Sequence, residues 1–174
     1  VKRPVPIGMG FGWSWGPNSQ GQLGDGNQGS NYTRPSPGRI LGLENVVALA
    51  GGSSHGLALL AYGTVWAWGA NDEGELGDGT TTTRAAPVQV QNLTSVQAIA
   101  AGWSHSLALR QDGTVWAWGS NLYGQLGDGS TGNQLVPVAV QGLTGVIAIA
   151  AGRDHSLAVT TDGEVWAWGS NDSA

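Results

Sequence analysis

The chain has 174 residues, of which 11% are charged, 30 are glycine, 9 are tryptophan and none is cysteine. The missing cysteines exclude disulfides and thiolate metal sites. The formal net charge is −5 and the seven basic residues are scattered, which disfavours a nucleic-acid-binding or anionic-membrane surface, because such surfaces need concentrated positive charge. No apolar run approaches the roughly 20 residues that span a bilayer, so we expect a soluble protein.

One sequence motif recurs along the chain with a period of about 50 residues. Trp68, Trp118 and Trp168 are 50 residues apart, and Trp15 precedes Trp68 by 53. The histidines keep the same period at His55, His105 and His155. Self-similarity at 20 to 50 residues predicts a solenoid, a propeller or an array of repeats.

The predicted elements begin with an N-terminal extension at residues 1–10 and a partial unit at residues 11–40. That unit contains the apolar run "GWSWG" and a glycine-rich loop ending in "LGDG". Two complete units follow at residues 41–91 and 92–141. A second partial unit, residues 142–174, ends the chain.

The unit at 92–141 has three short runs of small, β-branched and aromatic residues: "SVQAIAAG", "HSLALR" and "GTVWAWG". An Asp-Gly pair separates the second run from the third, and such pairs favour the tight turns of β-hairpins. The runs are therefore predicted to be antiparallel strands.

A fourth run contains proline, at 87–90 ("PVQV") and at 137–140 ("PVAV"). Proline cannot donate to a strand ladder, so we expect this run at the edge of each sheet. Four-stranded antiparallel units of this length predict an all-β fold, a β-propeller. The chain holds an incomplete arc of about three repeats, either a fragment or a unit that closes by oligomerisation.

Tryptophans occur in pairs two residues apart, so both rings of a pair project from the same face of a strand. Each ring can bury on the order of 150–250 Å² between neighbouring blades, which predicts a structural role. The alternative is an exposed aromatic ladder that stacks sugars or bases. The eight residues are Trp13, Trp15, Trp66, Trp68, Trp116, Trp118, Trp166 and Trp168.

The three histidines stand at the same place in different units, so they are expected around the ring and not at one metal centre. We predict that each imidazole is structural, hydrogen-bonded to backbone near a strand start. The acidic stretch 71–79 lacks the ligand pattern of an EF-hand. No Gly-x-Ser-x-Gly elbow is present. These patterns indicate a protein without metal, cofactor or enzymatic activity.

The segment "AIAAGWSHSLALRQDGTVWAWGSNLYGQLGDGS", with the later "PVAV", closely resembles the repeat of the RCC1-like (regulator of chromosome condensation) β-propeller family. The resemblance covers residues 11–171. It implies a propeller that typically has seven blades and serves mostly as a protein-binding platform. No wedge-like insertion or basic tail, on which the family's nucleotide-exchange activity depends, is visible in the sequence.

The units differ from one another mainly in two loops, and loops on a rigid scaffold often carry recognition. Several of the variable residues are of the types enriched in interface hot spots. The candidate protein-binding residues are Trp103, Ser104, Arg153, Asp154, Leu122, Tyr123, Asp72 and Glu73.

We therefore expect a non-enzymatic module that binds a protein partner through these loops. One alternative is a self-assembling unit whose exposed terminal blades join copies into a closed ring. A third hypothesis is a carbohydrate-binding propeller. Neither nucleic acid nor membrane is an expected partner, and the sequence leaves the cellular compartment open.

Overall fold

The computed structural model describes residues 10–172, which form thirteen strands and no helix. No segment of this part of the chain is a helix long and apolar enough to cross a membrane. The strands are β1 (Trp13–Pro17), β2 (Thr33–Arg39), β3 (Val46–Gly51), β4 (His55–Leu60), β5 (Val65–Gly69), β6 (Arg84–Gln89), β7 (Val96–Ala101), β8 (His105–Arg110), β9 (Val115–Gly119), β10 (Gln134–Ala139), β11 (Val146–Ala151), β12 (His155–Thr160) and β13 (Val165–Gly169).

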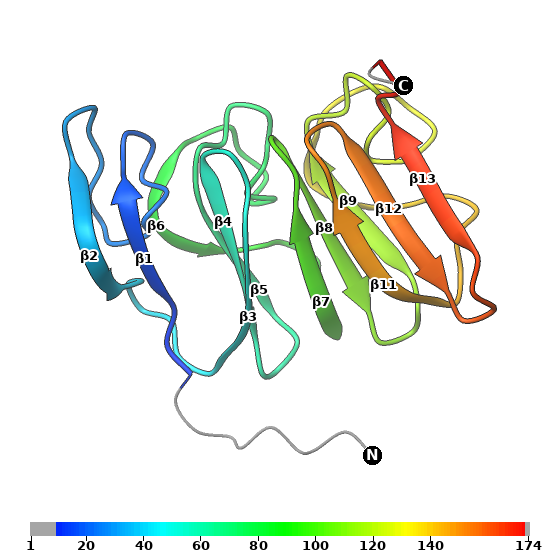
Figure 1. Cartoon of the computed structure of the whole chain (residues 1–174), viewed down its shortest axis with the longest axis horizontal. Coiled ribbons are helices and arrows are strands. Elements are labelled where there is room, and N and C mark those ends of the chain that lie inside the picture. Colours follow the sequence, from blue (N-terminus) through cyan, green and yellow to red (C-terminus); the bar gives the residue numbers. More distant parts are fainter. Residues whose placement is uncertain (1–9, 173–174) are drawn as a thin grey trace.

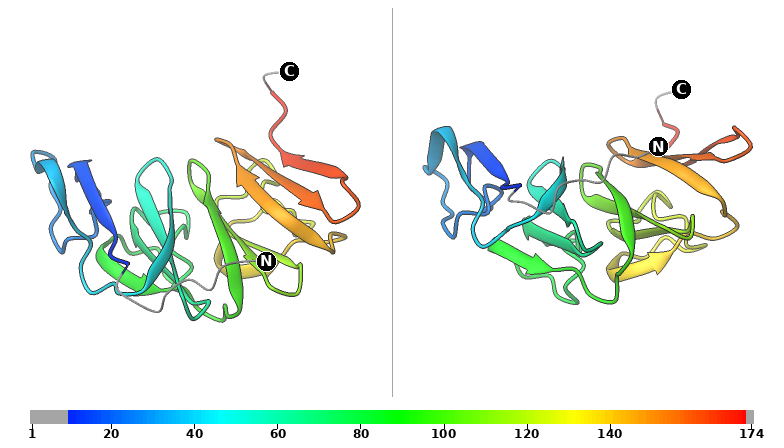
Figure 2. Two further views of the ribbon diagram at one scale, coloured as in Figure 1. Left: turned by 60° about the horizontal axis from the view of Figure 1, so that its bottom comes forward. Right: turned by 90° about the horizontal axis from the view of Figure 1, so that it is seen from below.

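The strands form four antiparallel sheets, and the order of strands within each sheet is the order in the chain. Two sheets have four strands, β3-β4-β5-β6 and β7-β8-β9-β10. The first sheet contains β1 and β2 alone, and the last contains β11, β12 and β13. The sheets follow one another across the molecule in a curved row (Figure 1, Figure 2). The predicted all-β architecture of repeated antiparallel sheets is confirmed.

Tight turns join β4 to β5, β8 to β9 and β12 to β13. The last two contain the Asp-Gly pairs that predict such turns, and the first contains Tyr62-Gly63. Gly113 has a φ of 79°, a value that favours glycine because a side chain would meet its own backbone. Its amide donates to Arg110 O at 3.0 Å, and Arg110 N donates to Thr114 O at 2.9 Å. These bonds close the hairpin between β8 and β9.

The proline-containing strand lies at a sheet edge, as expected, but it begins three residues earlier than predicted. β6 starts at Arg84 and β10 at Gln134, upstream of the prolines. The ladder pairs Arg84 with Gly69 and then Val88 with Ala67. This irregularity leaves Pro87 outside the registered pairs, so its missing amide hydrogen costs the sheet no bond.

Apolar residues of facing sheets fill the spaces between the sheets. Leu57, Val65 and Ala67 of one sheet form a single cluster with Val96, Ala108 and Trp118 of the next. At the last sheet the equivalent positions are open: Val165 is 72% exposed, whereas Val65 is fully buried. Within the described residues 10–172, β13 has neither a further sheet packed against it nor a fourth strand beside it, whereas β5 has both.

In three of the four pairs, the second tryptophan connects its sheet to the preceding unit. The indole Nε1 of Trp118 donates to Glu75 O at 2.8 Å, and Trp168 donates to Gln125 O at 2.9 Å. Trp68 bonds Gln22 O in the same way. The pairs therefore do not form a continuous exposed ladder of rings.

The predicted packing between sheets needs correction for part of the tryptophan set. Trp66 and Trp116 are half-buried, whereas Trp13, Trp15 and Trp166 are exposed. Trp13 and Trp15 lie on β1, whose sheet has only two strands, and Trp166 lies on the edge strand β13. Neighbouring strands that would cover these rings are absent from the described part of the chain.

Candidate functional site

The two variable loops of each unit lie at the same end of its sheet. His105 pairs with Gly119 across β8 and β9, so the loop before β8 and the loop after β9 meet there. Ser120 N donates to Ser104 O at 2.8 Å and joins the two loops directly. Ala70 bonds Ser54, and Ser170 bonds Asp154, in the same way. All eight candidate residues therefore come to one end of the sheets, which we call the loop end.

The loop end comprises the segments that connect the strands on this side. They are residues 18–32, 52–54, 70–83, 102–104, 120–133, 152–154 and 170–172.

The short loops of successive units form a hydrogen-bonded row. Ser53 N donates to Trp103 O at 3.1 Å, and Trp103 N donates to Arg153 O at 2.9 Å. These residues hold the same position in their units, so the row places their side chains next to one another. The Arg153 guanidinium lies over the Trp103 ring, 4.6 Å from its centroid.

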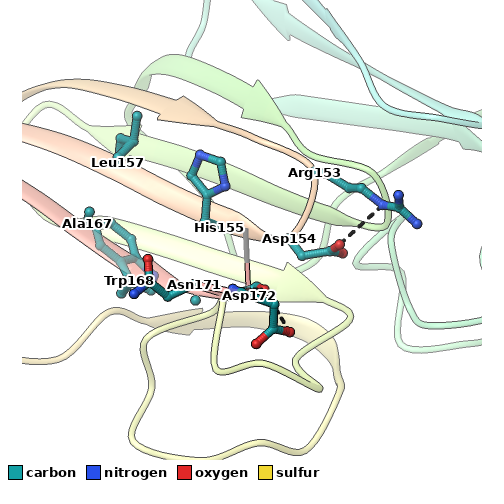
Figure 3. A pocket seen from close by; sticks show the side chains of 10 residues that line it. Arg153, Asp154, His155, Leu157, Ala167, Trp168, Asn171 and Asp172 are labelled. Atoms are coloured by element: carbon teal, nitrogen blue, oxygen red, sulfur yellow. Dashed lines mark hydrogen bonds and ion pairs between the residues drawn. The ribbon is translucent and has the colours of Figure 1, made fainter. Parts of the chain in front are cut away.

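Arg153 also forms an ion pair with its neighbour in the chain. Its Nε lies 3.3 Å from the carboxylate of Asp154, as Figure 3 shows. His155, Leu157 and Trp168, drawn in the same view, are among the residues that line an open hollow beside the last sheet. Its volume is about 740 Å³. The hollow lies at the edge of the loop end, where no further sheet within residues 10–172 packs against β12 and β13.

Each long loop is organised by a buried asparagine at its start. In the third sheet Asn121 Oδ1 accepts from Leu126 N at 3.0 Å, while Nδ2 donates to Asp128 Oδ1 at 3.1 Å. Asn71 and Asn18 make the corresponding bonds in the earlier units. These hydrogen bonds from Asn121 fix the conformation of the loop, and therefore the positions of the exposed residues beside it. Those residues are Leu122 and Tyr123.

Aspartates of the repeated "LGDG" motif close the same loops. Burial raises the pKa of the Asp78 carboxyl, but hydrogen bonds from Thr80 and Arg84 outweigh this, and the pKa lies below its ordinary value. Arg84 also forms a 3.0 Å ion pair with Asp78. In the next unit Gln134 stands in place of the arginine and bonds Asp128. Both aspartates are therefore held by contacts within their own loops and at the start of the following strand.

The acidic loop of the second sheet crosses to the third sheet. Asp72 is exposed, and Glu73 accepts a hydrogen bond from Asn133. Glu75 is buried, and burial raises the pKa of its carboxyl. Its backbone carbonyl accepts from both Ser106 and Trp118. The acidic segment therefore spans the boundary between two units.

Two histidines bridge neighbouring sheets through serine hydroxyls. His55 Nε2 lies 3.1 Å from Ser106 Oγ, and His105 Nε2 lies 3.0 Å from Ser156 Oγ. Since Ser106 Oγ donates to Glu75 O at 2.9 Å, it accepts from His55, which carries its proton on Nε2. Burial lowers the pKa of His55 and of His105 to about 4, and repulsion from the next histidine adds to the effect.

This geometry corrects the expected backbone partner of the histidines. The partner is a side chain one unit further along, and His155, on the last sheet, is exposed. Sequence reasoning missed Ser106 and Ser156 as part of this contact. The signal was the serine that directly follows the histidine in the units at 92–141 and 142–174, where the unit at 41–91 has Gly56.

The histidines of the described residues do not converge on one centre. No group of three histidine, aspartate or glutamate side chains within residues 10–172 has the arrangement of a metal site. The contacts of His55 and His105 are with serine, as described above.

Comparisons with known proteins agree with this architecture. A family model described as the RCC1-like domain matches residues 10–174. Protein RCC2 homolog from Danio rerio is 46% identical over 65 residues, which are 37% of this chain and 13% of the relative. Probable E3 ubiquitin-protein ligase HERC3 from Homo sapiens is 40% identical over 67 residues, 37% of this chain and 6% of that protein.

Solved structures match over more of the chain. Prp20p from Saccharomyces cerevisiae superimposes with a TM-score of 0.81 at 27% identity, covering 97% of this chain and 43% of that one. Human WBSCR16 has a TM-score of 0.80 at 27% identity, with coverages of 90% and 42%. The chain thus spans less than half the length of these two solved chains. It belongs to the RCC1-like family and forms an incomplete arc of that β-propeller.

Proposed function

We propose that this chain is a non-enzymatic protein-binding module and that its contact surface is the loop end. Two solved structures of one relative support a protein-binding role by analogy. Yeast RCC1 (Prp20), which has a TM-score of 0.78 at 27% identity and of which this chain covers 40%, has been solved bound to Kap60. Prp20p is also described by its binding properties to Gsp1p and histones.

The observation that carries the proposal is a contrast between the scaffold and the loops. Beneath the loop end, His55 and His105 make matching contacts to the next sheet. In the loop end itself, the equivalent positions of three units hold different residues, Ser53, Trp103 and Arg153, and all three are exposed. A constant support with a varied surface is the arrangement expected of a recognition site, since the variation does not serve the fold.

Exposed apolar side chains strengthen the assignment. Trp103, Leu122 and Tyr123 are all exposed at the loop end. Large exposed apolar and aromatic residues on a rigid surface are typical of protein interfaces. An enzymatic role is disfavoured, because both buried histidines are engaged in contacts that hold the sheets together.

The experiment is quantitative capture of partner proteins from the source organism on the immobilised chain. A variant with Trp103→Ser, Leu122→Ser and Tyr123→Ser should lose the partners that the parent chain retains. A matched variant at the opposite end, Tyr62→Ser with Leu41→Ser, should retain them. Equal capture by both variants, with circular dichroism showing both to be folded, would contradict the proposal.

A second candidate function is assembly of copies through their terminal sheets. Exposed Trp13 and Trp15 at one end of the arc and exposed Val165 and Trp166 at the other favour it. Light scattering coupled to size exclusion tests this candidate. A discrete oligomer that Val165→Glu with Trp166→Glu converts to monomer supports it, whereas a monomeric parent chain rejects it.

A further inference from the structure

One position of the repeat carries a hydroxyl group in the first unit and an aliphatic side chain in the next two. Ser36 directly precedes Pro37 in β2, and the residues that precede the equivalent prolines of β6 and β10 are Ala86 and Val136. Ser36-Pro37 is also the only Ser-Pro or Thr-Pro pair in the sequence. Since the strand forms with alanine or valine at this position, the fold does not require the hydroxyl of Ser36.

Strand β2 holds Ser36 outside its ladder. Gly38 and Arg34 pair with residues of β1, and residues 35–37 between them have no registered partner. All three of these residues are exposed. β2 lies at one end of the row of sheets, and within residues 10–172 its sheet contains only one other strand, β1 (Figure 1). Ser36 is therefore accessible at the edge of a two-stranded sheet.

Arg34 fixes the two ends of this exposed segment. Its Nη2 donates to Gly38 O at 2.9 Å and to Ser14 O of β1 at 2.7 Å. Gly38 leaves room for the guanidinium, because a Cβ at this position would stand 2.6 Å from Arg34 Cζ. A proline also restricts the residue before it to an extended conformation, and Ser36 precedes Pro37. The segment therefore presents Ser36 in extended backbone.

An exposed basic side chain follows three residues after Ser36. The guanidinium of Arg39 lies over the ring of Phe11, 3.3 Å from its centroid. This contact uses the face of the planar group and leaves its N–H edge for another acceptor. None of the ion pairs within residues 10–172 involves Arg39. Its positive charge is therefore available to an acidic group of a partner.

We propose that Ser36 is a phosphorylation site for a proline-directed serine/threonine kinase. Such kinases bind their substrate in an extended conformation and accept a serine or threonine that is followed directly by proline. One subgroup also requires lysine or arginine three residues after the acceptor. Ser36, Pro37 and Arg39 meet these requirements together. The site lies outside the loop end, and the assignment does not depend on the proposed function.

The phosphoryl donor is ATP bound by the kinase. A bond forms between Ser36 Oγ and the γ-phosphorus, and the bond from that phosphorus to the bridging oxygen of the β-phosphate breaks. ADP leaves with the electrons of the broken bond, and the hydroxyl proton passes to the catalytic aspartate of the kinase. The product is a phosphoserine on the exposed segment of β2, with Arg34 and Gly38 still pairing with β1.

The test incubates the folded chain with a purified cyclin-dependent kinase bound to its cyclin and with magnesium ATP, and intact mass spectrometry follows the reaction. We expect a single phosphoryl group per chain, located on Ser36 by peptide fragmentation. Ser36→Ala should abolish the modification and still fold, because the next unit has alanine at this position. Arg39→Gln should slow the modification about tenfold through loss of one charged contact with the kinase.

Two controls separate the site from general reactivity and from the sequence motif alone. Ser30→Ala changes an exposed serine of the same unit that no proline follows, and it should leave the rate unchanged. A synthetic peptide of residues 31–42 carries the motif without the fold, and its kcat/KM should lie within about tenfold of that of the folded chain. A folded chain that stays unmodified, with or without modification of the peptide, would overturn the proposal. A phosphoryl group that persists in Ser36→Ala would overturn it as well.

Discussion

The imidazole of His55 lies 3.1 Å from the hydroxyl of Ser106, which belongs to the next sheet. That hydroxyl donates in turn to Glu75 O, the carbonyl that also accepts the Trp118 indole hydrogen. One buried chain of hydrogen bonds thus joins a histidine of one unit to the loop of the same unit through a serine of the next. The contact recurs between His105, Ser156 and Gln125.

Ser106→Ala should lower the free energy of unfolding by about 1–3 kcal/mol, because it leaves a buried imidazole donor without an acceptor. Urea denaturation followed by far-ultraviolet circular dichroism measures the change. Ser53→Ala is the control, since that side chain is exposed, and it should stay within about 0.5 kcal/mol. A loss for Ser106→Ala no larger than that of the control would mean that water replaces the hydroxyl.

Stability should fall as the pH drops from about 6.5 toward about 4. The pKa of His55 and of His105 is lowered to about 4 in the folded chain, while an unfolded histidine titrates near 6.5. In this interval the unfolded state binds more protons than the folded state, so acid favours unfolding by up to about 1.4 kcal/mol per pH unit for each histidine.

Other groups that face this region shift the profile in known directions. Burial raises the pKa of Glu75, which opposes the histidine effect, because its folded carboxyl binds a proton more readily than the unfolded one. The lowered pKa values of Asp78 and Asp128 cost stability only at more acidic pH. Urea midpoints between pH 7.5 and 4.5 test the prediction. The slope should flatten in His55→Gln with His105→Gln, and a slope unchanged in that variant would assign the effect to carboxylates.

Much of the fold was predictable from local patterns. The hairpin over β8 and β9 follows from the Asp112-Gly113 pair, and the edge position of β6 follows from Pro87. The hairpin and the edge position both depend on the backbone conformation within a few residues of Gly113 and of Pro87. The start of β6 at Arg84 was not predictable in this way, because it depends on an irregular register against β5.

The contacts between sheets were less accessible to sequence reasoning. Periodicity predicts a structural role for His55 but not its partner, which is Ser106, 51 residues further on. Which atom faces which depends on how adjacent sheets are staggered, and periodicity alone carries no information about that stagger. Trp66 and Trp68 share a face of β5, yet they differ in burial, and Trp68 is the one whose indole donates to Gln22 O in the loop of the preceding unit. The candidate loop residues were chosen from differences between units, and their gathering at one end follows from the strand pairing.

Trp118→Ala should be among the most damaging single substitutions in the chain. The residue is fully buried and lies between two sheets, so the change removes apolar contacts, leaves a cavity and deprives Glu75 O of a donor. A loss of about 3–5 kcal/mol is expected from urea denaturation. Trp15→Ala, at the equivalent but exposed position of the first sheet, should lose less than about 1 kcal/mol. Similar losses at both positions would contradict the bridging role.

Two glycines of one loop separate backbone strain from packing between sheets. Gly124 and Gly127 have φ values of 75° and 66°, so an alanine at either position is strained by roughly 1–2 kcal/mol. A Cβ on Gly124 would meet open space, whereas a Cβ on Gly127 would stand 2.8 Å from the Trp168 Nε1 atom. To make room, Trp168 must move and weaken its bond to Gln125 O.

Gly127→Ala should therefore destabilise the chain by about 1–3 kcal/mol more than Gly124→Ala, the usual cost of overpacking. Urea denaturation gives the difference, and near-ultraviolet circular dichroism reports whether a tryptophan has moved. The second readout matters because Gly127→Ala should perturb the aromatic signal and Gly124→Ala should not. Equal losses with unchanged aromatic spectra would mean that the last sheet can shift to make room for the new Cβ without a change in the free energy of unfolding. The loop of one unit would then not fix the position of the next.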